Sequence, residues 1–285
     1  RNGYMVWRAN DIDSRHDVWS VSKSFTSTIL GLLIDDNKTT EDTLAKKYYS
    51  ALNVHYPNVK LRHFATMRSG YTSTSTGPDS WNPRLRSIKP DVPAYAPPGS
   101  KNSYHDPAMT MFGYLLTLIS DSSMRDMFKT RIADRIGMPS SGWLWDSWTS
   151  ENGKDVCYGH AGIFITARQL ARFGHLYLNR GNWNGNQIIR ESWVDKATSL
   201  KVPLSVPWSG SGDDVGGQYG YNWWLNGIKR SGTRKWPNAP LKTFVAAGHN
   251  NMCFVIPEWN MVIVRMGLDG NTVDDNEYNT FFSKV

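Results

Sequence analysis

The sequence has few of the features that define disulfide-rich, metal-binding or membrane-spanning proteins. Only Cys157 and Cys253 occur among its 285 residues, which excludes a disulfide framework and a cysteine-based metal site. No apolar run approaches the ~20 residues that cross a bilayer, so we expect no membrane span. The chain begins at Arg1 without a basic and apolar leader, and we expect any signal peptide to be already removed.

The sequence also lacks a concentrated patch of one charge. Its 32 Lys and Arg against 25 Asp and Glu give a net charge of +7, but the basic residues are scattered. The densest group, residues 228–235, reads as a loop. A nucleic-acid footprint would form a stripe or patch, so we predict a solvated basic surface and no nucleic-acid partner. Six histidines show no metal spacing and are interpreted as structural: His16, His55, His63, His105, His160 and His175.

Aromatic side chains, by contrast, are abundant, with 13 tryptophans. Large aromatic residues dominate buried area, so most of them should lie in the core. A few stand in stretches that read as loops and are candidates for the wall of a cleft: Trp81, Trp143, Trp145 and Trp208. Such walls would favour an uncharged or aromatic ligand group.

The N-terminal segment predicts one strand and one buried helix. Residues Tyr4–Trp7 alternate weakly and are rich in strand formers, and residues 1–3 read as a hairpin turn. We therefore expect the first strand of that hairpin, with an N-terminal helix, to be absent from this chain. A helix is predicted over residues 20–36, because apolar residues recur there at helical spacing.

The middle of the chain predicts helices joined by long loops. "DPAMTMFGYLLTLIS" starts with an Asp-Pro signal, and "TARQLARFGHLYLNRG" carries a helical apolar stripe that ends at a glycine. "ESWVDKATS" is a third, shorter helix. Residues 73–100 have almost no periodicity, and long loops of this kind are often functional.

The C-terminal part predicts strands and a last helix. Short strand-like runs occur between turns in "YGYNWWLNG", "KTFVAAGHN", "MCFVIPEW" and "NMVIVRMGL". We predict an α/β (α+β) fold with an antiparallel sheet built from both termini and flanked by helices. Residues 1–36 plus 216–285 would form the sheet domain, and residues 37–215 an inserted helical lobe. A cleft between the two would hold the active site.

One short motif suggests chemistry at the start of the first helix. Ser20 and Lys23 are three residues apart, so they share one face of a helix. A serine hydroxyl is a poor nucleophile unless a base takes its proton, and a lysine can be that base. The alternative is a serine that caps the helix, with a lysine that extends outward.

Five segments in the same order extend this motif into a family resemblance. They are "WSVSKSFTSTILGLLID", "LRHFATMRSGY", "APPGSKNSYHDPAMTMFGYLL", "GHAGIFITARQLARFGHLYLNRGNWNGNQIIRESWV" and "AAGHNNMCFVIPEWNMVIVRMG". Together they resemble the serine β-lactamase-like hydrolases with the Ser-x-x-Lys motif. The similarity is greatest to the branch of class C β-lactamases, family VIII esterases, D-aminopeptidases and nylon-oligomer hydrolases. The resemblance implies the β-lactamase-like fold.

The resemblance also implies roles for individual residues. Ser20 matches the acylated nucleophile, and Lys23 matches the partner that holds or shuttles its proton. Tyr104 matches the tyrosine of the second motif, which helps to activate the serine and protonates the leaving group. The oxyanion hole would use the N–H of Ser20 and a second N–H from Gly248, His249 or Asn250.

Two departures from the family pattern bear on specificity. Asp106 stands where the family's Tyr-x-Asn motif has asparagine, and it could pair with Lys23 and hold it charged, leaving Tyr104 as the main base. His249 stands where the third motif, Lys-Thr-Gly, has lysine. Histidine is mostly neutral at pH 7, so it should bind a substrate carboxylate less well than lysine does.

The sequence therefore predicts a serine hydrolase that cleaves a small ester or amide through an acyl-enzyme, as a carboxylesterase does. The alternatives are a β-lactamase or a penicillin-binding-type D-amino peptidase. A third is a sensor that binds β-lactams or peptidoglycan without turnover. No metal or organic cofactor is implied, and the oligomeric state is not predicted. The compartment is left open, with a bacterial periplasmic or secreted location favoured.

Overall fold

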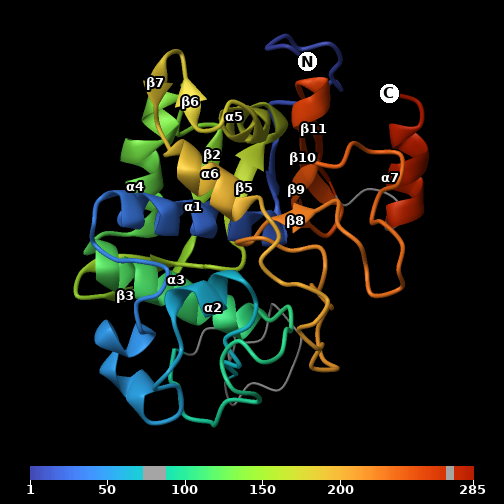
Figure 1. The fold of residues 1–285 in the computed structure, drawn as a ribbon. Coiled ribbons are helices and arrows are strands. Elements are labelled where there is room, and N and C mark those ends of the chain that lie inside the picture. Colours follow the sequence, from blue (N-terminus) through green and yellow to red (C-terminus); the bar gives the residue numbers. More distant parts are fainter. Residues whose placement is uncertain (73–87, 268–272) are drawn as a thin grey trace.

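The C-terminal third of the chain forms an antiparallel sheet. The computed structural model describes residues 1–72, 88–267 and 273–285, and Figure 1 shows its arrangement. The strands are β8 (Trp224–Leu225), β9 (Phe244–Gly248), β10 (Asn251–Ile256) and β11 (Met261–Arg265), in the order β11-β10-β9-β8. Gly248 pairs with Asn251, so residues 249 and 250 form a two-residue turn between β9 and β10.

Helices cover both faces of this sheet. On one face α5 (Ala167–Leu178) packs against β10 and β11. A Cβ atom at Gly174 would lie 2.6 Å from Sγ of Cys253, so only glycine allows this close approach of helix and strand. On the other face Phe254 packs against Tyr278 and Phe282 of α7 (Asp275–Phe282). The sheet is thus held between α5 and α7 (Figure 1).

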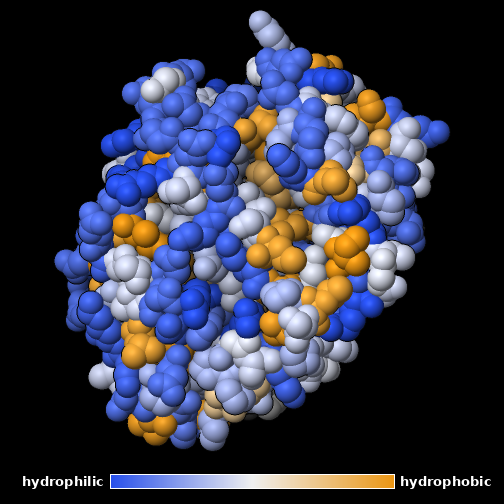
Figure 2. Space-filling model, viewed as in Figure 1, coloured by the Kyte–Doolittle hydropathy of each residue, from blue (hydrophilic) through white to orange (hydrophobic). Residues whose placement is uncertain are grey.

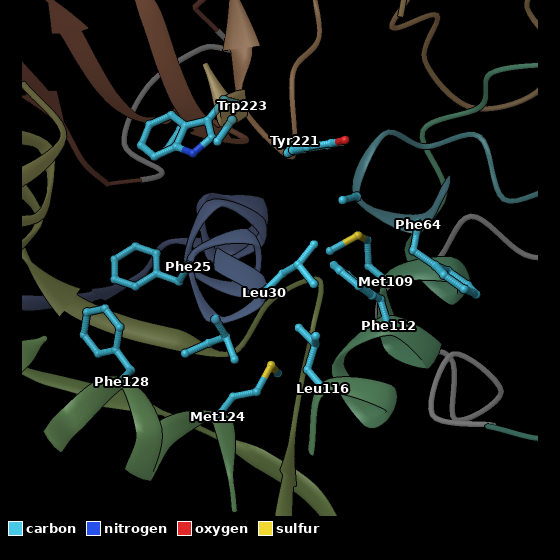
Figure 3. Packing of buried hydrophobic residues seen from close by; sticks show 14 of the residues in the cluster. Phe25, Leu30, Phe64, Met109, Phe112, Leu116, Met124, Phe128, Tyr221 and Trp223 are labelled. Atoms are coloured by element: carbon cyan, nitrogen blue, oxygen red, sulfur yellow. The ribbon is translucent and has the colours of Figure 1, made fainter. Parts of the chain in front are cut away.

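The helix α1 (Ser22–Asp35) lies in the centre of the molecule. Every residue from Ser22 to Leu33 is buried. It contacts α3 (Asp106–Ser120) and α4 (Met124–Arg131), and Figure 3 shows Phe25 and Leu30 pointing from α1 toward these helices. The Phe25 and Phe128 ring centroids are 5.1 Å apart. Because all sides of α1 are packed, its N-terminal turn is fixed relative to both the sheet and the helices.

Smaller elements complete the fold. A second sheet has the order β1-β5-β2 and is formed by β1 (Arg15–Asp17), β5 (Ile163–Thr166) and β2 (Trp143–Trp145). Two hairpins follow, β3 (Ser147–Glu151) with β4 (Lys154–Cys157), and β6 (Asn182–Trp183) with β7 (Asn186–Gln187). The short α-helices are α2 (Leu61–Ala65) and α6 (Glu191–Ala197). The 3-10 turns are η1 (Trp19–Val21), η2 (Ala45–Lys47), η3 (Ser50–Asn53), η5 (Ala133–Arg135) and η6 (Pro257–Trp259).

The predicted fold class and the predicted long helices are confirmed, but the strand at Tyr4–Trp7 is wrong. Those residues pair with no strand in the described part of the chain, and Tyr4 and Trp7 are 79% and 80% exposed. A strand signal without a surface to bury its side chains does not produce a strand. The N-terminal strand is instead β1, which pairs with β5. Within the described residues, the sheet of β8 to β11 therefore contains no N-terminal strand.

Two other expectations lie outside what the structure describes or tests. Most of the predicted loop 73–100 belongs to residues 73–87, which are outside the described residues. The division into a sheet domain, residues 1–36 plus 216–285, and a lobe, residues 37–215, stays a prediction. On the face seen in Figure 2, hydrophilic side chains dominate, and apolar side chains gather over the loops around β8.

Candidate active site

The two residues of the Ser-x-x-Lys motif are in direct contact. Ser20 lies in the turn η1, and Lys23 lies in the first turn of α1. Nζ of Lys23 donates a hydrogen bond of 2.6 Å to Oγ of Ser20. The N-terminal ends of η1 and α1 have no side-chain cap, so Ser20 does not cap the helix. Lys23 is 1% exposed and does not extend into solvent.

The buried ammonium of Lys23 has three further neighbours. Its Nζ lies 2.7 Å from Oδ1 of Asp106, donates to the carbonyl oxygen of His160 at 3.2 Å, and lies 4.6 Å from the centre of the Tyr104 ring. A buried charge is costly unless it is paired and hydrogen-bonded. Lys23 meets both conditions, and its side chain has one defined position beside Ser20.

Asp106 begins helix α3 and faces Lys23. Burial raises the pKa of its carboxyl group, but the charge of Lys23, with the imidazoles of His160 and His105, lowers it by more. The net result is a pKa below the usual value. Its position at a helix N-terminus also favours a negative charge. Asp106 is therefore an ionised carboxylate at neutral pH.

Tyr104 is fixed between the nucleophile and the sheet. Its backbone N–H donates to the carbonyl oxygen of Asp213 at 3.1 Å, and its ring stacks on Trp224 with centroids 5.6 Å apart. Burial raises the pKa of its hydroxyl well above the usual value, and the charge of Asp106 adds to this, whereas a hydrogen bond with Ser20 lowers it. Tyr104 is thus a neutral phenol beside Ser20.

The end of strand β9 lies against the backbone of Ser20. A Cβ atom at Gly248 would lie 2.4 Å from the carbonyl oxygen of Val18 and 2.5 Å from the N atom of Ser20. Only glycine permits this approach. His249 follows with φ +49°, and its ring packs edge-to-face on Trp19 at 4.7 Å. The turn after β9 therefore lies beside the N–H of Ser20.

Asn250 and Asn251 stabilise this turn by hydrogen bonds to neighbouring segments of the chain. Oδ1 of Asn250 accepts from the N–H of Val273, and its carbonyl oxygen accepts from Arg265. The Asn251 amide donates to the carbonyl oxygens of Asp17 and Gly248. Among the predicted oxyanion residues, Gly248 and His249 line the cleft described next, whereas the side chain of Asn250 is used in these structural contacts.

A cleft of about 850 Å³ brings most of the predicted residues together. Ser20, Tyr104, Asp106, Gly248 and His249 line it, and Lys23 lies buried directly behind Ser20. Its lining also includes charged residues farther from Ser20, among them Lys229, Lys235 and Asp275. The arrangement offers a nucleophile with a hydrogen-bonded amine, a phenol and a nearby carboxylate.

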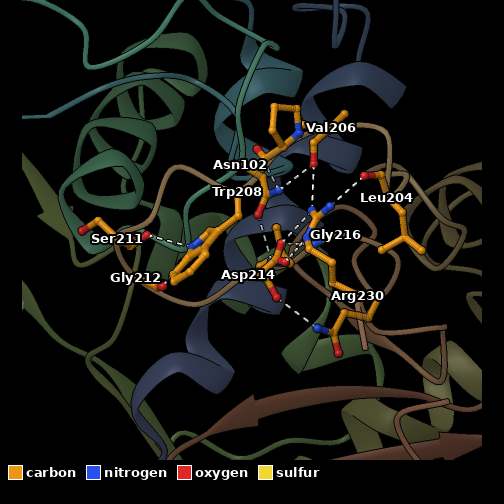
Figure 4. Close-up of polar contacts among 12 residues, drawn as sticks. Asn102, Leu204, Val206, Trp208, Ser211, Gly212, Asp214, Gly216 and Arg230 are labelled. Atoms are coloured by element: carbon orange, nitrogen blue, oxygen red, sulfur yellow. Dashed lines mark hydrogen bonds and ion pairs between the residues drawn. The ribbon is translucent and has the colours of Figure 1, made fainter. Parts of the chain in front are cut away.

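The tryptophans of the cleft differ from those predicted. Trp19, Trp224 and Trp236 line it. Trp143 and Trp145 are wrong as candidates, because they lie in strand β2 and are 5% and 0% exposed. Trp208 is outside the lining and donates its Nε1–H to backbone carbonyls of its own loop (Figure 4). Trp81 lies outside the described residues. Consecutive residues of a strand point to opposite faces, so the adjacent tryptophans of "NWW" could have indicated that one of them faces a cleft. Trp223 is buried, and Trp224 faces the cleft.

His160 was interpreted as structural, but it lines the cleft. Its Nδ1 lies 3.0 Å from Oγ1 of Thr110, and its carbonyl oxygen accepts from Lys23. The glycine before it would place a Cβ atom 2.0 Å from the carbonyl oxygen of Met109. That glycine, in "YGHAG", was the one local signal of a close backbone approach at this point.

Two further observations concern metals and membranes. Within residues 1–72, 88–267 and 273–285, no three His, Cys, Asp or Glu side chains are grouped so that they could hold a metal ion. In the same part of the chain, every helix is too short or too polar to cross a bilayer.

Comparisons with known proteins agree with this fold. A family model described as "Beta-lactamase" matches residues 2–280. A family VIII carboxylesterase structure has 13% identity and a TM-score of 0.72 over 95% of this chain and 83% of the other. A β-lactamase from Mycobacterium bovis has 15% identity and a TM-score of 0.70 over 99% and 90%. A candidate 6-aminohexanoate-dimer hydrolase from Bacillus anthracis has 21% identity and a TM-score of 0.70 over 98% and 75%. At such identities these structures show a shared fold.

Proposed function

Because the chain belongs to the beta-lactamase family, we propose that it is a serine hydrolase that cleaves a small ester or amide through an acyl-enzyme on Ser20. The observation that carries the proposal is the 2.6 Å hydrogen bond between Nζ of the buried Lys23 and Oγ of Ser20 at the cleft. A capping serine would not need a buried amine on its oxygen. A nucleophile does need a partner for its proton.

In the proposed reaction, Oγ of Ser20 attacks the carbonyl carbon of the substrate and forms a tetrahedral intermediate. Its proton enters the unit formed by Lys23 and Tyr104, which returns a proton to the leaving alcohol or amine. Water then attacks the acyl-enzyme, and the unit works in the reverse direction. Asp106 forms an ion pair with Lys23 and adds to the high pKa of Tyr104. The unit therefore becomes a base only when it loses a proton.

The negative charge of the intermediate would be stabilised by backbone donors. The N–H of Ser20 is one of them, and the turn after Gly248 supplies the second. Donors placed before the reaction starts stabilise a developing oxyanion by several kcal/mol, about 3–4 for a single one. The close approach of Gly248 to the N atom of Ser20 supports this assignment.

The cleft supports a neutral or aromatic acyl group. Trp19 provides an apolar wall beside His249, and His249 stands where the family motif has a cationic lysine. We therefore propose carboxylesterase-like or amidase activity as the main function. The β-lactamase and D-amino peptidase alternatives depend on recognition of a substrate carboxylate at the third motif, which His249 supports less well.

The proposal is tested with a panel of p-nitrophenyl esters, anilides and nitrocefin, together with intact-mass detection of an acyl adduct. Turnover of short esters with an adduct that maps to Ser20 is the expected result. Faster turnover of nitrocefin than of any ester would favour a β-lactamase. A single burst of product without steady turnover would indicate a sensor that is acylated once.

A further inference from the structure

The cleft continues past Tyr104 to two lysines of the basic loop 228–235. This loop is a short hairpin, with a bridge between Ile228 and Arg234. It was expected to be a solvated surface, but Lys229 and Lys235 line the cleft and are only 32% and 16% exposed. Nζ of Lys235 lies 4.9 Å from the Trp224 ring and 5.2 Å from the Trp236 ring. The ammonium of Lys235 is thus held against two aromatic rings inside the cleft.

The two lysines share a single carboxylate. Nζ of Lys229 lies 3.4 Å from Oδ2 of Asp275, and Nζ of Lys235 lies 3.3 Å from Oδ1. Charge-assisted hydrogen bonds to carboxylates are usually about 2.7–2.9 Å long. Within the described parts of the chain, neither lysine has another ion-pair partner. The two ammonium groups therefore share one negative charge at longer distances than usual, and one positive charge is left in excess.

Asp213 and Asp214, in a neighbouring loop, form no ion pair with Lys229 or Lys235 within the described residues and so do not neutralise their excess positive charge directly. Asp214 is engaged by Arg230, with Nε 2.6 Å from Oδ2, as Figure 4 shows. Asp213 lines the cleft with an exposed side chain, and its charge acts on Lys235 from a distance. Burial lowers the pKa of Lys235, and the charge and the long hydrogen bond of Asp275 offset this only in part. An incoming anion would neutralise the remaining positive charge.

The position of Lys235 relative to Tyr104 indicates which part of a substrate it meets. Tyr104 stacks on Trp224, and Lys235 lies against the same Trp224 ring. In the proposed function Tyr104 protonates the leaving group, so that group lies on the Tyr104 side of Ser20. Lys235 and Lys229 then lie farther along the same side. A group that reaches them belongs to the alcohol or amine that leaves.

We propose that Lys235 and Lys229 bind a carboxylate on the leaving group, which makes the preferred substrate an ester or amide of a carboxylate-bearing alcohol or amine. The inference rests on the proposed function, because it uses the leaving-group role of Tyr104. It assigns anion recognition to the loop between β8 and β9 and not to the third motif at His249. Asp275 already shows that the two ammonium groups can be reached by the oxygens of one carboxylate.

The test compares para-acetoxybenzoate with its neutral analogue para-acetoxybenzamide, which differ in the charge on the leaving phenol. The readout is the ratio of kcat/KM for the two esters. Lys235→Met should lower that ratio about tenfold, Lys229→Met should lower it less, and Lys235→Arg should retain it. Lys242→Met, which removes an exposed lysine outside the cleft, is the matched control and should leave the ratio unchanged.

A second measurement separates this inference from the proposed function. Calorimetric binding of the product para-hydroxybenzoate needs no turnover, and its Kd should rise in Lys235→Met and Lys229→Met. If wild-type enzyme cleaves neither ester but binds the product through the lysines, the hydrolase proposal fails and the anion site stands. If both esters are cleaved and neither lysine variant changes the ratio or the product Kd, the anion site is refuted. Because Lys229 is more exposed, its variant serves if Lys235→Met does not fold.

Discussion

Nζ of Lys23 lies 2.7 Å from Oδ1 of Asp106, so the aspartate that replaces the family's asparagine touches the amine that contacts Oγ of Ser20. This pair differs from a lysine held by a neutral amide, because it brings a full negative charge to the proton-transfer unit. The charge acts on both members of the unit. It attracts the ammonium of Lys23 and raises the pKa of Tyr104.

The first prediction follows from this charge. The unit formed by Lys23 and Tyr104 can accept the serine proton only after it has lost a proton of its own, and the raised pKa of Tyr104 opposes that loss. We therefore expect kcat/KM for a neutral ester to increase with pH on the alkaline side. Asp106→Asn removes one cause of the raised pKa of Tyr104, and the rising limb should move to lower pH. The pH profile of kcat/KM checks this, with Asp134→Asn, at an exposed ion pair with Lys129, as control. A limb that stays in place or moves to higher pH would contradict it.

Ser20→Ala should abolish acyl transfer and leave the fold intact. The nearby Ser27→Ala is a matched control, because Ser27 is buried in helix α1 and its Oγ has no hydrogen-bond partner among the described residues. Both variants should unfold at nearly the wild-type temperature, since even a lost capping serine costs only ~1 kcal/mol. Near-native ester turnover by Ser20→Ala would remove Ser20 as the nucleophile.

Lys23→Ala and Tyr104→Phe should each lower kcat strongly, and the double variant should lose much less than the sum of the two. Residues that act as one proton-transfer unit are non-additive, and here the lysine ammonium lies 4.6 Å from the tyrosine ring. A double-mutant cycle on kcat measures the coupling. Fully additive losses would show that the two side chains work independently.

His249→Lys should improve recognition of a carboxylate near the scissile bond. A hydrogen bond to a charged group is worth about 1.5–3 kcal/mol, so the ratio of kcat/KM for nitrocefin to that for a neutral ester should rise roughly tenfold. The Asp106→Asn change should increase the gain, because Asp106 lines the same cleft and repels a carboxylate. Wild-type preference for nitrocefin, or an unchanged ratio in the lysine variant, would refute this account of specificity.

Gly248→Ala should reduce activity more than the small size of the added methyl group suggests. The added Cβ atom would lie 2.5 Å from the N atom of Ser20, and one of the two must move. A displaced oxyanion donor commonly costs a factor of about 100 or more in kcat. Single-turnover acylation of the variant tests this, because the loss should be in acylation and not in substrate binding. Unchanged acylation would show that the turn can shift freely.

The sequence was most informative where a pattern is long and local. The helix Asp106–Ser120 follows from an Asp-Pro start and a continuous apolar stretch, and the Ser-x-x-Lys contact follows from helical spacing. The strands of the C-terminal sheet were visible as short runs between turns. These features depend on residues close together in the chain, so no knowledge of packing was needed.

Features that depend on packing were not predictable. Tyr4–Trp7 has the composition of a strand, but none of the strands that the structure describes pairs with it. β1 is only three residues long and owes its existence to pairing with β5. The inward orientation of Lys235 depends on Trp224 and Trp236, and a basic loop gives no sign of which side chains turn inward. The tryptophans of the cleft could not be distinguished from those of the core for the same reason.

The burial of α1 on all sides has a consequence for how the enzyme loses its activity. Local opening releases the segments with the fewest buried contacts, and central helices open only with the whole molecule. Lys23 belongs to such a helix, and Ser20 lies in the turn that leads into it. Amide hydrogens of residues 26–33 should therefore exchange among the slowest in the chain. Loss of catalysis in denaturant should coincide with global unfolding, with no range in which the enzyme is folded yet its nucleophile is released.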